Sequence, residues 1–263
     1  MIQLNIAPWQ YVVSGILAIV IAPMFAPPPA IAAEEESAIA RGGRLYDKWF
    51  KENKAEKPTT DHAAYPHPGG KYGKDASWRC KECHGWDYRG NEGAYASGKH
   101  ATGIKGIRAA AGKDPKEIAD MLRKPPHGYT EAQLSATDSS DLALFVSKGQ
   151  IDFATLVEAD GKPKGDGAKG EAYFNTLCAG CHGTDGTKIK EAPLGPVSGN
   201  AVEMIHKILN GQPGHAGAAR ARSTDLRRYC CASPNAAQIT RAVIIAIQCR
   251  AIPDRAALAL SAL

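Results

Sequence analysis

The sequence predicts an all-α protein made of two similar halves in tandem. The chain has 263 residues, which is enough for two domains of about 100 residues each. Helical periodicity recurs in both halves, and no alternation of apolar and polar residues persists long enough to indicate a strand. A stretch rich in Gly, Pro and charged residues at 160–167 separates the halves, as expected of a linker.

Residues 1–32 are predicted to be a signal peptide. An apolar run at 11–26 is followed by prolines and then by Ala30 and Ala32, the order of an h-region and a small-x-small cleavage site. The run is short and broken by proline for a membrane span, although the absence of Lys or Arg before it leaves an uncleaved anchor as the alternative. We therefore expect export to the periplasm.

The first half, residues 33–155, should contain three main helices. Gly43 and Tyr46 lie in a helical pattern near its start. A second helix is expected at 115–123, and a third at 139–148 has an apolar face that closes the half. The segment 62–77, which contains His62 and His67, is an insertion that the sequence explains either as a docking loop or as a simple connection.

The second half, residues 168–214, repeats the start of this pattern. It follows a linker at 156–167, and its Gly170 and Tyr173 have the same spacing as the glycine and tyrosine of the first half. A further helix is expected at 201–210. Residues 215–263 differ in composition from everything before them and are treated as an anomalous tail.

Each half contains one C-x-x-C-H motif followed by glycine. The motifs comprise Cys80, Cys83 and His84 in the first half and Cys178, Cys181 and His182 in the second. Two thiols three positions apart on a helical turn can reach both vinyl groups of one porphyrin, and the adjacent histidine then lies under the iron. We therefore expect two covalently bound haem c groups, each with its motif histidine as the proximal iron ligand.

Other uses of these cysteines are less consistent with the sequence. A zinc site made from both pairs would have to join cysteines that are 95 positions apart, between 83 and 178. A thioredoxin-like redox pair would need a βαβ context, and no strand pattern precedes either motif.

The net charge of +5 does not indicate nucleic-acid binding. Residues 1–214 contain 25 Lys and Arg against 25 Asp and Glu, whereas residues 215–263 contain 7 against 2. The whole excess therefore lies in the tail, and no basic surface is implied for the two halves.

Each half resembles a class I cytochrome c domain, and together they resemble the periplasmic dihaem cytochromes c of bacteria. The stretches that carry the resemblance include WRCKECHGWDYRG, TGIKGI and LALFVSKGQID, and it extends from about residue 40 to residue 214. It implies two all-helical haem domains that transfer electrons between redox partner proteins by transient docking, without being an enzyme. The alternatives are a cytochrome subunit of a larger dehydrogenase and a dihaem enzyme such as a thiosulfate dehydrogenase. Contact with a membrane would come only through partners or an uncleaved signal anchor.

The distal iron ligand of the first haem is expected to be His127. The resemblance implies a methionine in the loop before the closing helix, but this loop reads Pro-Pro-His-Gly-Tyr and has no methionine. His127 occupies the corresponding place, so we expect a bis-His iron. A solvated loop histidine is the alternative reading, and His100 is the second candidate; Met121 is expected to pack inside its helix.

The distal ligand of the second haem depends on the tail. A Gly-Gln-Pro-Gly turn at 211–214 should precede a Met-Pro pair, but His215 and Ala216 follow, and no methionine occurs after Met204. A one-base shift of a His-Ala codon pair can read Met-Pro, so we hypothesise that residues 215–263 are a frameshifted translation. If the tail is genuine, His215, His206 or Met204 is the candidate ligand.

Overall fold

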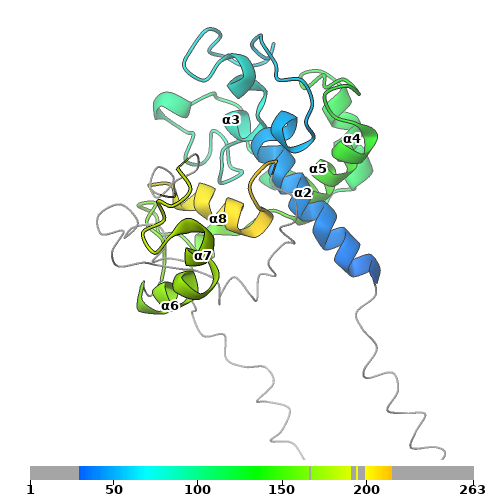
Figure 1. The fold of residues 1–263 in the computed structure, drawn as a ribbon. Helices are drawn as coiled ribbons and strands as arrows, with labels where there is room; N and C mark the ends of the chain where they lie inside the picture. Colours follow the sequence, from blue (N-terminus) through cyan, green and yellow to red (C-terminus); the bar gives the residue numbers. More distant parts are fainter. Residues whose placement is uncertain (1–29, 166, 191–193, 195–198, 215–263) are drawn as a thin grey trace, which may run out of the picture. The chain divides into compact units, whose positions relative to one another are not determined.

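The computed structural model describes residues 30–165, 167–190, 194 and 199–214 (Figure 1). The chain divides into two units, 1–35 and 36–263, and every contact discussed below lies within the second. Over the described ranges the secondary structure is helical, with only two isolated β-bridges, which confirms the prediction of an all-α protein. None of the helices in this part is both long and apolar enough to cross a bilayer.

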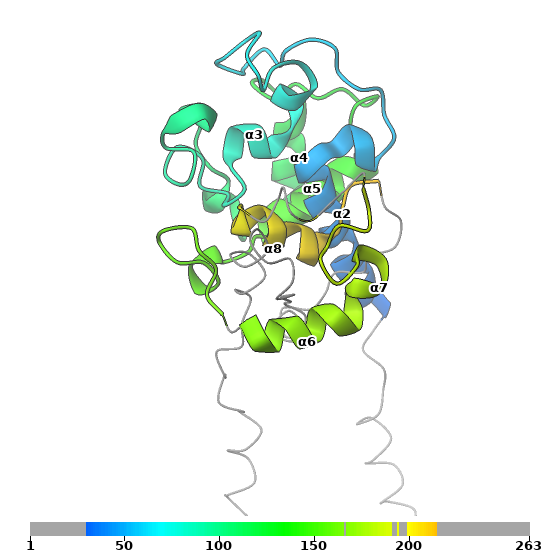
Figure 2. The same cartoon turned by 60° about the vertical axis from the view of Figure 1, so that its left-hand side comes forward.

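Seven α-helices and four short 3₁₀ helices make up the described fold. The α-helices are α2 (Ala30–Glu52), α3 (Cys80–His84), α4 (Pro115–Arg123), α5 (Ala136–Lys148), α6 (Gly167–Leu177), α7 (Ala179–His182) and α8 (Ala201–Asn210). The 3₁₀ helices are η2 (Lys74–Trp78), η3 (Gly98–His100), η4 (Arg108–Ala110) and η5 (Phe153–Thr155). Each C-x-x-C-H motif thus falls on a single helical turn, and Figure 2 shows α6 leading into the second of these turns, α7.

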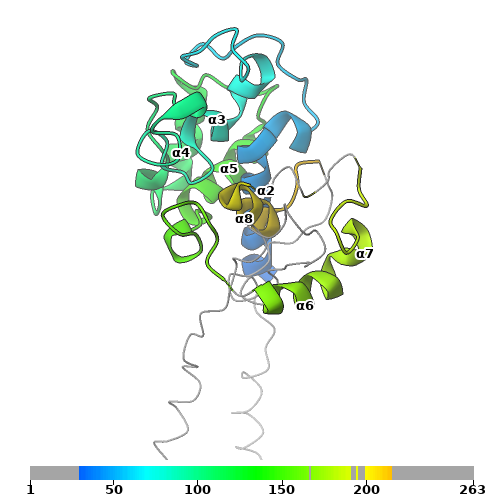
Figure 3. The same ribbon diagram turned by 90° about the vertical axis from the view of Figure 1, so that its left-hand side faces the viewer.

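The N-terminal capping residues of α4 and α5 determine where these two helices begin. Asp114 caps α4 by accepting a hydrogen bond from the Lys116 amide at 2.9 Å, so the helix has the predicted bounds. The closing helix α5 begins earlier than the predicted 139, because Ser135 and Asp138 form a capping box. The two helices pack against each other (Figure 3), with Ile118 among the buried residues of α4.

Two adjacent glycines in α2 allow close contact with two other helices. A Cβ atom at Gly42 would lie less than 3.0 Å from the Asp141 carbonyl oxygen and from Phe145 in α5. A Cβ atom at Gly43 would lie equally close to the side chain of Asn210 at the end of α8. Since real Cβ contacts are not this short, both helix crossings require glycine.

The helix α8 shares the hydrophobic core of the first half. Its Ile205 and Leu209 belong to the same buried cluster as Leu45 of α2 and Leu142 of α5. The Arg44 side chain donates a 2.8 Å hydrogen bond to the carbonyl of the last residue of α8. The views of Figures 1 and 2 both place α8 beside α2.

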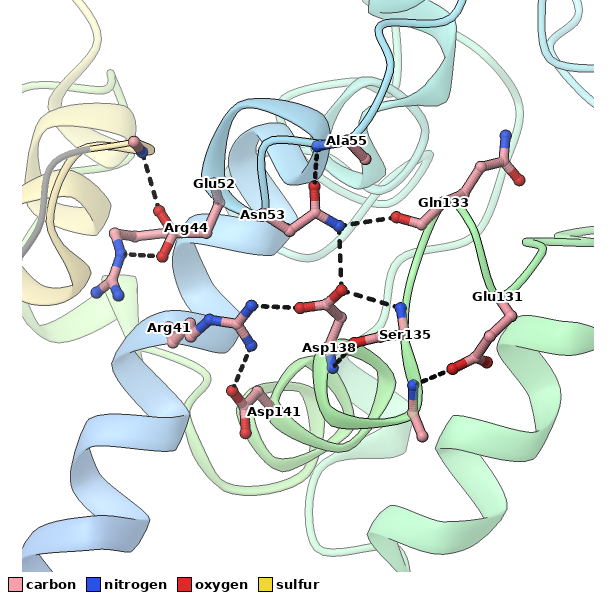
Figure 4. Close-up of polar contacts among 12 residues, drawn as sticks. Arg41, Arg44, Glu52, Asn53, Ala55, Glu131, Gln133, Ser135, Asp138 and Asp141 are labelled. Atoms are coloured by element: carbon pink, nitrogen blue, oxygen red, sulfur yellow. Dashed lines mark hydrogen bonds and ion pairs between the residues drawn. The ribbon is translucent and has the colours of Figure 1, made fainter.

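A partly buried polar network fixes the crossing of α2 and α5 (Figure 4). Arg41 of α2 pairs with both Asp138 and Asp141 of α5, and its contact with Asp141 is 2.7 Å. The side-chain amide of Asn53, just after α2, donates a hydrogen bond to Asp138 Oδ2 at 3.1 Å. Because Asp138 also belongs to the capping box with Ser135, the start of α5 and the crossing of the two helices are stabilised by one carboxylate.

Candidate functional site

A cavity of about 410 Å³ lies behind the first C-x-x-C-H motif. Its polar wall includes Cys80, Cys83, His84 and His127. Its apolar walls come from the loop after the motif and from α4 and α5, and include Ile104, Ile107, Ile118, Leu122, Leu142 and Val146. A volume of this size, with mostly apolar walls and a few convergent polar groups, is typical of a site for a small molecule or cofactor.

The single turn α3 places both thiols of the first motif on the cavity wall. Cys80 and Cys83 are partly buried, and burial raises the pKa of each thiol to about 12. Both are therefore neutral thiols at pH 7, which makes them weak nucleophiles toward external reagents. Their spacing on one turn leaves both sulfurs able to reach the same bound molecule.

The orientation of His84 is set by a backbone carbonyl. Its Nδ1 lies 2.7 Å from the carbonyl oxygen of Lys105, and because a carbonyl can only accept, Nδ1 carries the proton. The lone pair is then on Nε2, the atom available to a metal. Burial lowers the pKa of His84, so its imidazole is neutral at pH 7, as metal ligation requires.

His127 faces His84 across the cavity. The centroids of the two imidazole rings are 6.0 Å apart and the ring planes differ by 38°. Burial also lowers the pKa of His127, although the Met121 carbonyl favours its protonated form. The Nδ1 atom of His127 is buried and makes no hydrogen bond of standard geometry.

The spacing of the two rings fits one iron between them. Two metal–nitrogen bonds of about 2 Å each, plus about 1 Å from each nitrogen to its ring centre, sum to about 6 Å. The two thiols lie on the same wall as His84, so the residues present fit a covalently attached haem. In the described part of the chain, no group of three or more His, Cys, Asp and Glu side chains is arranged to hold a bare metal ion.

The two competing candidates for the first distal position have other surroundings. His100 is not among the residues that line the cavity; its ring stacks 4.9 Å from that of Tyr95 and 4.4 Å from that of Tyr72. Met121 lines the cavity, but it is 52% exposed, which does not fit the expected packing role inside α4.

The second motif has the same local conformation as the first. Gly85 and Gly183, which end the two turns, have φ/ψ of 79°/156° and 78°/160°. In both copies the histidine carbonyl accepts a 2.9 Å hydrogen bond from the amide six residues later. In both copies, too, the aspartate three residues after the histidine, Asp87 or Asp185, accepts a hydrogen bond from the amide two residues further on. The repeat inferred from the sequence therefore extends to backbone geometry at the motifs.

The surroundings of the second motif are described only in part. Cys181 is exposed, and burial lowers the pKa of His182. No described ring faces His182 in the way that His127 faces His84, and Met204 is buried in α8. His206 uses both ring nitrogens elsewhere, since Nε2 donates to the Gly43 carbonyl at 2.9 Å and Nδ1 accepts from the Tyr88 hydroxyl at 2.8 Å.

His215 and the rest of the tail, residues 215–263, lie outside the described residues. The frameshift hypothesis and the choice of a second distal ligand therefore stay predictions. The signal peptide predicted at 1–32 also falls almost wholly outside them.

Sequence reasoning assigned no function to three residues around the first motif. His62 lines the cavity and contacts the distal loop, residues 124–129 after α4, at His127. Glu82, between the two motif cysteines, is buried and paired with Lys81. Asp47 of α2 is 2% exposed and pairs with Arg79, directly before the motif, and with a lysine of α8. In the sequence, His62 was marked only as part of the insertion at 62–77 and Glu82 only by its position inside the motif, and no pattern indicated their contacts or those of Asp47.

The cavity thus offers two thiols for covalent attachment, one imidazole on the same turn and a second imidazole opposite. This arrangement can hold a flat cofactor by its edge and by both axial positions of a central metal. No protein-family model, curated protein or solved structure matches this chain.

Proposed function

We propose that this chain is a periplasmic dihaem c-type cytochrome that carries electrons between redox protein partners. The observation that carries the proposal is the cavity in which the first motif faces His127, with a ring separation of 6.0 Å. The resemblance of both halves to class I cytochrome c domains supports the same function. The shared backbone conformation of the two motifs supports a second, similar attachment site.

In this proposal the chain's own residues hold and tune the cofactor. Cys80 and Cys83 would form the thioether bonds, and His84 and His127 would ligate the iron. The bound haem would supply one-electron transfer between ferric and ferrous iron. The Lys105 carbonyl accepts a hydrogen bond from His84 Nδ1. This bond increases the basicity of His84 Nε2, the nitrogen that would ligate the iron. The apolar walls would limit the access of water to a bound iron and so would influence its potential.

A carrier agrees with this geometry better than an enzyme does. Metal centres that act on substrates keep one coordination position of the metal open or exchangeable. At the first site, His84 and His127 would both ligate an iron held between them, so such an iron would keep no open coordination position for a substrate. A carrier and a dedicated cytochrome subunit of a dehydrogenase would share this site, and copurification from the host would distinguish them.

The proposal is tested by the haem content of the purified protein. A pyridine haemochrome assay should give about two haems per chain, and both should stay with the protein after extraction with acidified acetone. Replacing Cys80 and Cys83 with alanine should leave about one, and so should replacing Cys178 and Cys181. A chain that carries no haem after expression with the haem-attachment machinery would refute the proposal.

A further inference from the structure

We propose that His62 is a positioning residue that holds the distal loop, and with it His127, against the haem iron. His62 Nε2 lies 3.0 Å from the carbonyl oxygen of His127, although the two residues are 65 positions apart. The Ala64 amide donates to His62 Nδ1 at 3.1 Å, so Nδ1 is an acceptor and Nε2 carries the proton. His62 therefore donates to the backbone of the residue that we propose as the distal ligand.

The His62 ring is fixed by its surroundings. It is 8% exposed and packs edge-on against the Trp78 ring, with a centroid distance of 4.5 Å. Trp78 is itself held by three hydrogen bonds: its indole donates to the Thr60 carbonyl at 2.9 Å, and its carbonyl accepts from Trp49 at 3.0 Å and from Tyr129 at 2.8 Å. A donor held this firmly can limit the movement of the group that accepts from it.

The insertion 62–77 forms a closed loop that ends beside the motif. The His62 amide donates to the Ser77 hydroxyl at 2.9 Å, and that hydroxyl donates to the Lys74 carbonyl at 2.6 Å. Asp61 accepts from the amides of Gly69, at 2.8 Å, and Lys74. The insertion therefore presents one imidazole to the distal loop from a segment that is anchored three residues before Cys80, so it is more than a connection.

The distal loop is also held at Tyr129, whose hydroxyl donates to the Trp78 carbonyl at 2.8 Å and whose amide donates to the Leu122 carbonyl at 3.0 Å, but His62 is the side chain that bonds to residue 127 itself. The amides of His127 and Gly128 both donate to the Lys124 carbonyl, at 3.0 and 3.1 Å, and these bonds lie within the loop itself. The bond from His62 ties the same residue to a different part of the chain. If this partly buried hydrogen bond is lost, the His127 carbonyl loses its partner, and His127 should dissociate from the iron about tenfold more often.

The inference rests on the proposed function. The experiment therefore uses the holoprotein. His62→Phe keeps a ring against Trp78 but removes the donor, and His62→Gln restores an N–H donor. His67→Phe is the matched control, because His67 lies in the same segment but bonds the Ala101 carbonyl at 2.7 Å, away from the distal loop. All variants also carry Cys178→Ala and Cys181→Ala, so that only the first haem contributes. The readout is the rate at which cyanide binds this ferric haem, together with the low-spin fraction in the absorption spectrum. We expect about tenfold faster binding in H62F, partial recovery in H62Q and no change in H67F.

A second comparison separates positioning from general stability. If His62 acts through His127, H62F should not accelerate cyanide binding further in a chain that already carries His127→Ala. Equal rates in H62F and H67F, or an equal acceleration with and without His127, would overturn the inference while leaving the two-haem proposal intact. A wild-type protein whose first haem lacks a sixth protein ligand would overturn both.

Discussion

The facing histidines of the cavity are the residues on which the proposed chemistry depends. His84 is on the motif turn and takes its tautomer from the Lys105 carbonyl, whereas His127 is on a loop. Both pKa values are lowered, mainly because burial disfavours the imidazolium form. Neutral imidazoles on both sides of the cavity are what a bis-His iron requires.

Replacing His127 with alanine should convert the first haem from low spin to high spin. The change removes the only imidazole that faces His84 among the described residues, so the iron loses a strong-field ligand. Absorption and electron paramagnetic resonance spectra should be recorded in a chain whose second motif carries Cys178→Ala and Cys181→Ala, so that a single haem contributes. His100→Ala is the control and should leave the spectrum unchanged. A six-coordinate, low-spin haem in the H127A protein would contradict His127 as the ligand.

The sequence could predict only part of this site. The motif residues could be proposed from their spacing, and His127 from the place that the resemblance to class I cytochrome c domains implies for the distal ligand. The roles of His62 and Asp47 could not, since each depends on partners far away in sequence: 65 positions for His62, and 32 and 160 positions for Asp47. Polar contacts between distant segments leave no periodic pattern that a single sequence could reveal.

Asp47→Asn should destabilise the protein in a pH-dependent way. Burial alone would raise the pKa of Asp47, but the cations of Arg79 and Lys207 outweigh it and bring the pKa to about 2. Because the folded pKa is below the usual 3.8, this stabilisation is present above about pH 4 and is lost as the pH falls toward 2. We expect D47N to lose about 2 kcal/mol at pH 7.

Urea unfolding at pH 7, 5, 4 and 3 would check this prediction. The difference in unfolding free energy between wild type and D47N should be constant from pH 7 to 5 and should shrink below pH 4. Asp160→Asn, which removes an exposed ion pair with Lys162, is the control and should have little effect. A difference that does not change with pH would show that the ion pairs of Asp47 do not stabilise the fold.

At the level of the elements, the glycine pair of α2 determines how closely the helices approach. Helical periodicity was enough to predict the bounds of α4 and α8, and the start of α5 differed because Ser135 and Asp138 form a capping box. Periodicity could not predict the close contacts at Gly42 and Gly43. A glycine in a helical pattern suggests a close contact, but it does not indicate which helix makes that contact.

Gly42→Ala should therefore destabilise the fold. The new methyl group would meet the Asp141 carbonyl and Phe145, so α2 and α5 would have to separate, at a cost of about 1–3 kcal/mol. Gly180→Ala is the matched control: it too lies in a helix, but none of the described residues outside its own helical turn lies within 4 Å of its Cβ position. Thermal unfolding followed by circular dichroism should show a lower midpoint for G42A and no loss for G180A. Equal midpoints would mean that the helices can separate without penalty.

At the scale of the whole molecule, the two halves of the sequence are not independent in their packing. The helix α8 follows the second motif in sequence, yet its Ile205 and Leu209 are buried in the cluster that contains residues of α2, α4 and α5. His206 connects the same helix to Tyr88, four residues after His84. Internal repetition in the sequence predicts two domains, but it does not indicate which half supplies the core around which motif.

The reading frame after Gly214 determines what the complete second half contains. If residues 215–263 are frameshifted, resequencing the gene should reveal a missing or additional base near the codon for Gly214, and the corrected frame should begin with Met-Pro. In the chain as written, the second haem should then be five-coordinate or wrongly ligated. An unchanged frame, together with a six-coordinate second haem in the purified protein, would mean that the tail is genuine.

Ile205→Ala should destabilise the first haem site although residue 205 lies in the second half. Ile205 is completely buried in the shared cluster, so truncating it leaves a cavity that costs about 2–4 kcal/mol. For a unit of this size, the midpoint of thermal unfolding should fall by about 5–10 °C. The first haem should be followed by its Soret band in the chain lacking Cys178 and Cys181. Leu177→Ala, at a side chain that is 51% exposed, should leave the midpoint almost unchanged. If I205A also leaves the first haem's midpoint unchanged, the halves unfold independently and α8 is not part of the first core.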